Sequence, residues 1–345
     1  MDAISWLEFF RESFFFTLKF EKSSRQQVGS TCYILISTVV IFLELVVGFA
    51  APYGKFYSSN SLGKCPVPPR LAWFLQELPS FAVSGYFLVQ SLQKKIITKL
   101  CDITTQKDVS WINRGLLSLM VFHYFNRTFI YSFRIKGGKP TAFMACALAA
   151  VFTAINGYLQ SLCLIQFNEY QIHNTSEPRL FIGVALFVIG FFINFHSDNI
   201  LRNLRKPGEK DYKIPRGGFF EYVTNAHYFG ENLEWLGFGI AGNNVGGYVF
   251  ALFTFANLFP RAAQSHQWYL KKFDNYPKNR KIYIPFLLTC VIAFVRPCPN
   301  ILTDFKSQNN KQIFKIISTI TFYFSDPAVV NFEVSNFLNR FCINS

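Results

Sequence analysis

Residues 180–208 read LFIGVALFVIGFFINFHSDNILRNLRKPG, and this stretch decides the class of fold. Its first part, 180–195, contains no charged residue and approaches the length of a membrane-spanning helix. Its second part begins at His196 and is densely charged. Charge at a membrane boundary is costly unless it faces water or binds something. The stretch therefore predicts a membrane helix that runs directly into a polar, ligand-binding or solvated segment.

Apolar runs recur on both sides of this stretch. They cover residues 32–50, 71–92, 116–133, 141–167, 233–242 and 248–259. Hydrophobic residues make up 51% of the chain and charged residues only 16%, a balance that a soluble protein rarely shows. Together with 180–195, these runs predict an all-α polytopic membrane protein built as a bundle of seven transmembrane helices.

The region 231–260 is either one span or a tight hairpin interrupted at residues 242–247. A single span puts the basic segments 198–216 and 261–281 on opposite sides of the membrane, whereas a hairpin puts both on one side. With the hairpin, most Lys and Arg residues fall on the inner side. Because inner loops carry the excess of positive charge, this distribution favours the hairpin.

The net charge of +14 is spread over the loops between the apolar runs. It forms no basic face studded with aromatic residues, so we expect no nucleic-acid partner. Anionic lipid head groups and anionic cofactors are the partners that this charge favours. The eight cysteines show no metal-ligand or redox spacing, and we interpret them as small buried apolar side chains. No metal site is expected.

Residues 237–242, GFGIAG, formally match the dinucleotide-binding fingerprint. That fingerprint requires a preceding strand and a βαβ unit, and here apolar membrane segments flank it. Close helix packing explains the glycines better. The chain also lacks the motifs of serine hydrolases and P-loop nucleotidases.

Two apolar runs contain polar residues whose place in an apolar segment requires an explanation. Glu77 lies within the run 71–92, where a carboxyl group must find a partner or keep its proton. A protonated carboxyl group can donate to a ligand carbonyl; a helix-packing role is the alternative. Tyr124, Arg127 and Tyr131 share a helix face by their spacing. Such a face suits a ligand with a carbonyl and an anionic group, although an interfacial aromatic belt with a snorkelling Arg gives the same pattern.

Several ordered motifs resemble the steroid 5α-reductase family, the 3-oxo-5α-steroid 4-dehydrogenases, and are closest in wording to its type 1 members. The resemblance covers roughly residues 30–286. The motifs are WFLQELPS (73–80), HYFNRT (123–128), GGKP (137–140), NGYLQ (156–160), LRNLRKPG (201–208), YKIPRGG (212–218) and WYL (268–270).

This resemblance implies a multi-pass enzyme of the endoplasmic reticulum membrane that uses NADPH, with the cofactor site facing the cytosol. In that family a hydride goes to C5 of a 3-oxo-Δ4 steroid. Glu77 and Tyr124 match the residues that hold the 3-oxo group, and Trp73 and Phe253 would join them around the steroid. The implied cofactor-binding residues are Arg127, Asn194, Asp198, Arg205, Tyr212, Glu231, Trp235, Arg261 and Tyr269.

The chain departs from the family pattern at His227, Ser265 and Asn257. It divides into an N-terminal segment (1–29), the reductase domain (30–286) and a C-terminal extension (287–345) that matches no part of the family pattern. Two rival functions remain at this stage: a related reductase of polyprenols or enoyl thioesters, and a catalytically silent sterol-binding paralogue. The physiological steroid and the oligomeric state are left open.

Overall fold

A computed structural model describes residues 65–92, 109–167, 178–204, 209 and 211–286, all within the compact unit Met1–Val295. These residues are mostly helical, which confirms the all-α prediction. The elements in chain order are β1 (Pro66–Val67), α3 (Pro69–Leu92), α4 (Trp111–Phe125), the π-helix η3 (Asn126–Tyr131), α5 (Ser132–Arg134), β2 (Thr141–Ala142), α6 (Phe143–Leu162), the π-helix η4 (Cys163–Phe167), α7 (Pro178–Asn203), the 3₁₀-helix η6 (Gly218–Glu221), α8 (Ala226–Gly242) and α9 (Val245–Lys272). The predicted run 32–50 and the predicted segments 1–29 and 287–345 lie outside the described residues.

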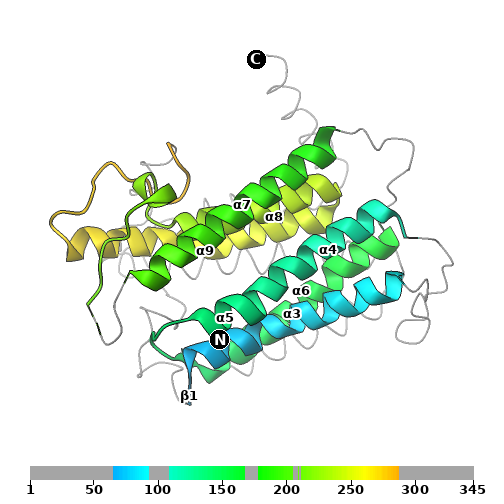
Figure 1. Ribbon diagram of the computed structural model, residues 1–345, viewed down its shortest axis with the longest axis horizontal. Coiled ribbons are helices and arrows are strands. Elements are labelled where there is room, and N and C mark those ends of the chain that lie inside the picture. Colours follow the sequence, from blue (N-terminus) through cyan, green and yellow to red (C-terminus); the bar gives the residue numbers. More distant parts are fainter. Residues whose placement is uncertain (1–64, 93–108, 168–177, 205–208, 210, 287–345) are drawn as a thin grey trace, which may run out of the picture. The chain divides into compact units, whose positions relative to one another are not determined.

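The helices form two groups. Helix α3 packs against α4 and α6, and α8 packs against α7 and α9 (Figure 1). The pairing of β1 with β2, with Pro66 opposite Ala142, ties the start of α3 to the start of α6. Fewer contacts join the groups, and they run between α4 and α8 and between α6 and α9. Buried apolar side chains, among them Leu117, Phe187 and Trp235, form the core.

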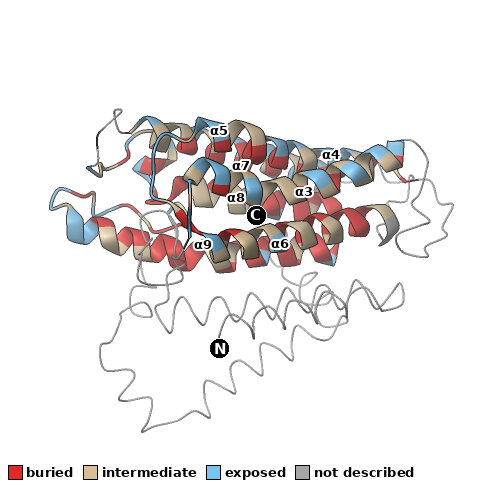
Figure 2. Ribbon diagram, turned by 90° about the horizontal axis from the view of Figure 1, so that it is seen from below, coloured by how far each residue is buried: buried red, intermediate tan, exposed pale blue. Residues whose placement is uncertain are grey.

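The outward faces of these helices are apolar. Figure 2 shows buried residues on the faces that the helices turn toward one another and exposed residues on the opposite faces. On α7 the exposed residues include Phe181, Ile182, Ile189 and Phe192. Contiguous apolar surface of this kind is unfavourable in water and favourable in lipid. The helices Phe143–Ile165 and Pro178–Asn203 are also long and apolar enough to cross a membrane. Both observations support a membrane protein.

The region 231–260 is a helical hairpin, as the charge distribution predicted. Helix α8 ends at Gly242, and its C-cap residue is Asn243, whose left-handed backbone (φ 45°) is one that Asn tolerates better than most residues. The next residue, Asn244, is the N-cap of α9, and its side chain accepts a hydrogen bond from the Gly247 N–H at 2.7 Å. Two adjacent asparagines therefore end one helix and start the next.

Glycines allow α7 and α8 to touch backbone to backbone. A Cβ added at Gly237 would lie 2.4 Å from the backbone nitrogen of Phe187, and one at Gly183 would lie 2.3 Å from that of Ala241. No side chain fits at such distances. Helix packing is thus the structural role of Gly237, which confirms the rejection of the dinucleotide fingerprint.

The cysteine prediction holds only in part. Cys146 and Cys163 are buried in helices, but Cys65 is exposed. Cys65 precedes β1 and has a positive φ of 65°, so it belongs to a connection outside the helix core.

Candidate active site

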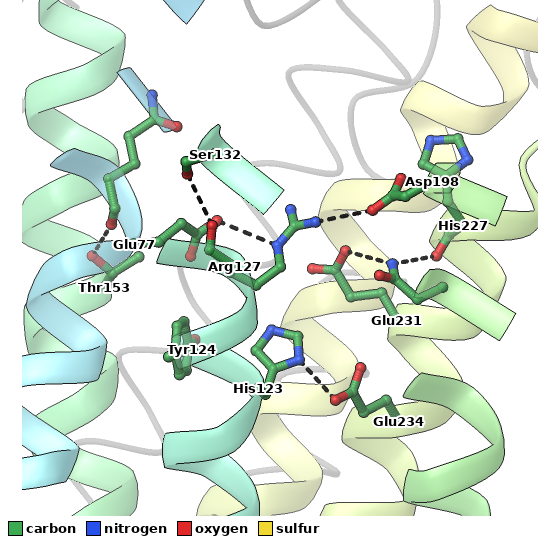
Figure 3. Close-up of polar contacts among 12 residues, drawn as sticks. Glu77, His123, Tyr124, Arg127, Ser132, Thr153, Asp198, His227, Glu231 and Glu234 are labelled. Carbon is green, nitrogen blue, oxygen red and sulfur yellow. Dashed lines mark hydrogen bonds and ion pairs between the residues drawn. The ribbon is translucent and has the colours of Figure 1, made fainter. Parts of the chain in front are cut away.

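Arg127 is the centre of a buried polar cluster. It lies in the π-helical turn that follows α4 and is only 6% exposed. Its Nε lies 3.7 Å from Oε1 of Glu77, and its Nη1 donates to Oδ2 of Asp198 at 3.4 Å (Figure 3). The rings of Trp73 and Tyr131 flank the guanidinium at 4.9 and 4.4 Å. The predicted shared face of Arg127 and Tyr131 is therefore confirmed.

The π-helical turn has a local cause and a consequence for the site. The hydroxyl and the backbone N–H of Ser132 both donate to the carbonyl of Arg127, which holds the widened turn. A single π turn inside an α-helix commonly marks a functional site because it alters the direction of side chains. Here the turn carries Arg127, the residue that contacts carboxyl groups from two other helices.

Tyr124 lies one turn before Arg127 and is buried. Its phenol oxygen accepts a hydrogen bond from Nδ2 of Asn156 at 2.9 Å. Its ring lies 5.8 Å from that of Trp235, and it interacts electrostatically with Glu77. The structure thus brings the two residues predicted to hold a carbonyl, Glu77 and Tyr124, into one cluster with the predicted cofactor residue Arg127.

Helices α7 and α8 supply the other side of this cluster. Nδ2 of Asn194 donates to the His227 carbonyl at 2.9 Å and approaches Oε2 of Glu231 at 3.5 Å. Glu231 interacts electrostatically with Arg127. Two predicted cofactor residues, Asp198 and Glu231, therefore lie on the sides of α7 and α8 that face Arg127 (Figure 3), and Asn194 contacts Glu231 beside them.

The remaining predicted residues lie in other surroundings. Trp235 is buried in the core between the rings of His123 and Phe250. Phe253 stacks on Phe152 at 4.4 Å, where α9 meets α6. Arg205 lies outside the described residues.

The last three predicted cofactor residues are Arg261 and Tyr269, in the C-terminal half of α9, and Tyr212, which contacts it. Nε of Arg261 donates to the phenol oxygen of Tyr228 at 3.0 Å. Tyr269 stacks on Tyr276 at 5.3 Å. Tyr212 lies 4.9 Å from Trp268, edge to face.

The departures from the family pattern also have visible surroundings. Nδ2 of Asn257 donates to the carbonyl of Phe253 in its own helix at 2.9 Å. The ring of His227 lies 4.0 Å from that of Tyr228. The altered pair Ser265–His266 is buried, and His266 bonds the hydroxyl of Thr224 through Nδ1.

One buried polar pair was not predicted from the sequence. Nδ1 of His123 and Oε1 of Glu234 lie 2.7 Å apart, and both side chains are almost fully buried. This pair joins α4 to α8 across the boundary between the helix groups. The only signal in the sequence is the presence of both residues in apolar segments, because 111 positions separate them.

The comparisons with known proteins agree with these observations. A family model described as 3-oxo-5-alpha-steroid 4-dehydrogenase matches residues 139–288. The chain is 48% identical to 3-oxo-5-alpha-steroid 4-dehydrogenase 1 of Mus musculus over 258 residues, 72% of this chain and 96% of that protein. It is 48% identical to the Homo sapiens type 1 protein over 254 residues, 71% and 93% of the two chains. Identity to the Rattus norvegicus type 2 protein is 40% over 267 residues, 75% and 95%.

Proposed function

This chain belongs to the 3-oxo-5-alpha-steroid 4-dehydrogenase family of membrane oxidoreductases, as its motifs predicted, and on that premise we propose that it reduces the C4–C5 double bond of a 3-oxo-Δ4 steroid with NADPH. The product is the 5α-reduced 3-oxo steroid. The observation that carries the proposal is the convergence of Glu77, Tyr124 and Arg127, from α3, α4 and η3, in a buried cluster that Asp198 of α7 joins.

Glu77 and Tyr124 would bind the 3-oxo group of the steroid. Hydride addition at C5 moves the electron pair of the double bond toward C4 and C3 and places negative charge on the 3-oxo oxygen. The Tyr124 hydroxyl and a protonated Glu77 carboxyl group donate to that oxygen. Donors that are already oriented in a buried site stabilise such an oxyanion strongly. A proton then completes the reaction at C4.

The donor set around Arg127 fits a reduced nicotinamide dinucleotide. A guanidinium suits phosphate oxygens, and carboxylates and amides suit ribose hydroxyls and the carboxamide. When bound, the cofactor supplies the hydride. Our proposed cofactor-binding residues are Arg127, Asn194, Asp198, Arg205, Tyr212, Glu231, Trp235, Arg261 and Tyr269. Trp73 and Phe253 would line the steroid site.

The membrane arrangement is part of the same proposal. In this proposal the helices α3, α4, α6, α7, α8 and α9 would be six of the spans, and the run 32–50 would be the seventh. The hairpin of α8 and α9 supports a common side for the basic segments 198–216 and 261–281. We place this side, and the cofactor site, on the cytosolic face of the endoplasmic reticulum. Residues 30–286 would form the reductase domain, between the segment 1–29 and the extension 287–345.

The test is conversion of a labelled 3-oxo-Δ4 steroid by microsomes that contain the full chain and NADPH. We expect conversion by the parent and a loss of about 10²-fold or more in kcat for Glu77→Gln and for Tyr124→Phe. Glu221→Gln is the matched control, since that carboxylate is half exposed on η6 and lies outside the cluster. Conversion of a polyprenol or an enoyl thioester in place of every steroid tested would refute the proposed substrate class. NADPH binding without any conversion would refute the proposed enzyme activity.

A further inference from the structure

Asn156 is a buried polar residue to which neither the motifs nor the proposed mechanism gives a role. It lies on α6 and is 0% exposed. Its Nδ2 donates to the phenol oxygen of Tyr124 at 2.9 Å. A buried amide that donates to a residue proposed to bind the substrate can act on the reaction through that residue.

The crossing of α3 and α6 holds Asn156 in place. A Cβ added at the neighbouring Gly157 would lie 3.0 Å from Cα of Ser80, so glycine permits this close approach. The hydroxyl of Ser80 donates to the carbonyl of Thr153 at 2.6 Å, which ties the same two helices together. Asn156 therefore sits on a rigid contact between helices, where its amide has little freedom to turn away.

The direction of the hydrogen bond determines what Tyr124 can do. A phenol has one hydrogen to donate and lone pairs that accept. Because the Asn156 amide occupies an acceptor position, the phenol hydrogen remains available for another acceptor.

We propose that Asn156 is a positioning residue that directs the Tyr124 hydroxyl hydrogen toward the 3-oxo oxygen of the steroid. The same N–H stabilises the phenol oxygen as the phenol shares its hydrogen with the developing oxyanion. This inference rests on the proposed role of Tyr124 and adds the residue that sets the polarity of its hydrogen bond.

The experiment compares two near-isosteric variants in two backgrounds. Asn156→Leu removes the donor, and we expect kcat to fall about tenfold with little change in the KM for steroid, because the lost interaction strengthens in the transition state. Asn156→Asp replaces the N–H by an acceptor that claims the phenol hydrogen. We expect its kcat to fall about as far as that of Tyr124→Phe, on the order of 10²-fold.

The decisive measurement repeats both changes in the Tyr124→Phe background. Without the phenol hydroxyl, neither change at Asn156 should lower kcat further, and NADPH affinity, measured by quenching of intrinsic fluorescence, should equal that of the parent. Equal losses with and without the hydroxyl would assign Asn156 a purely structural role and overturn the inference. Should the aspartate variant fail to accumulate, the leucine variant decides the question by the same cycle.

The two proposals fail in different ways. If Tyr124→Phe leaves conversion unchanged, the proposed role of Tyr124 is wrong, and the inference about Asn156 falls with it. If Tyr124→Phe lowers kcat about 10²-fold but Asn156→Leu lowers it by the same factor in both backgrounds, only the role of Asn156 is refuted.

Discussion

Gly190→Ala tests whether the site depends on backbone contact between α7 and α8. A Cβ at Gly190 would lie 2.4 Å from the backbone nitrogen of Glu234 and 2.6 Å from the carbonyl oxygen of Gly230. These are backbone atoms, so no side-chain rotation relieves the clash. The helices must separate by roughly 1 Å to restore ordinary contact, an overpacking change that typically costs about 1–3 kcal/mol.

The same separation of α7 from α8 would displace proposed cofactor-binding residues. Asn194 lies one turn beyond Gly190, and its amide spans the two helices to the His227 carbonyl at 2.9 Å. Moving α7 away lengthens this hydrogen bond beyond the useful range. Loss of one hydrogen bond corresponds to about two- to tenfold in affinity. We therefore expect Gly190→Ala to lower both the unfolding midpoint and the affinity for NADPH.

The assay is thermal unfolding of the purified protein in detergent, together with NADPH titration by fluorescence. Gly115→Ala is the matched control, because Gly115 is an exposed residue within α4 and a Cβ there would meet nothing within 4 Å. Because alanine favours a helix more than glycine does, Gly115→Ala should leave the stability unchanged or raise it by up to about 1 kcal/mol. Equal stability and NADPH affinity for Gly190→Ala and the parent would refute the close contact of α7 and α8.

Two further predictions concern the carboxyl groups of Glu234 and Glu221. Glu234→Leu or His123→Leu should each destabilise the protein by about 1–3 kcal/mol, because one change leaves the other polar group buried without its partner. The double variant should lose less stability than the sum of the losses of the two single variants. Strictly additive losses of stability in thermal unfolding would show that the pair does not interact. At Glu221 the Gly217 N–H, together with Arg280 and Arg216, lowers the carboxyl pKa in the folded state. This stabilisation is therefore complete above the unfolded pKa of about 4.3 and is lost as the pH falls through the folded pKa. The unfolding midpoint of the parent should drop more steeply below about pH 4.3 than that of Glu221→Gln, and parallel curves would contradict this.

Much of the helical architecture follows from the sequence because lipid leaves few alternatives. The apolar run 71–92 predicts α3 almost to the residue, and the run 180–195 predicts the apolar part of α7. Helices satisfy their own backbone hydrogen bonds, so an apolar run of this length in a membrane has essentially one structure. The hairpin also follows, since charge on the two flanking segments distinguishes it from a single span.

Other features depend on contacts that periodicity does not encode. The run 116–133 gave no sign of the π turn at Asn126–Tyr131, because the run is largely apolar on both sides of the turn and a change of helical phase within it is not visible. The polar end of α7 extends to Asn203, well past the apolar run, and Asp198 in it faces Arg127 on η3 rather than lipid. Pairs such as His123 with Glu234 become visible only when the helices pack.

Polar contacts in the site join the two helix groups in addition to the apolar core that both groups share. Arg127 reaches from η3 to Asp198 on α7, and His123 reaches from α4 to Glu234 on α8. Buried polar pairs add little net stability compared with apolar packing, but they tolerate few alternative alignments. One group presents Glu77 and Tyr124 to the steroid carbonyl in our proposal, and the other presents residues to the cofactor. The bridging pairs therefore fix the alignment between the hydride donor and its acceptor, and a change in either pair should alter turnover even where both ligands still bind.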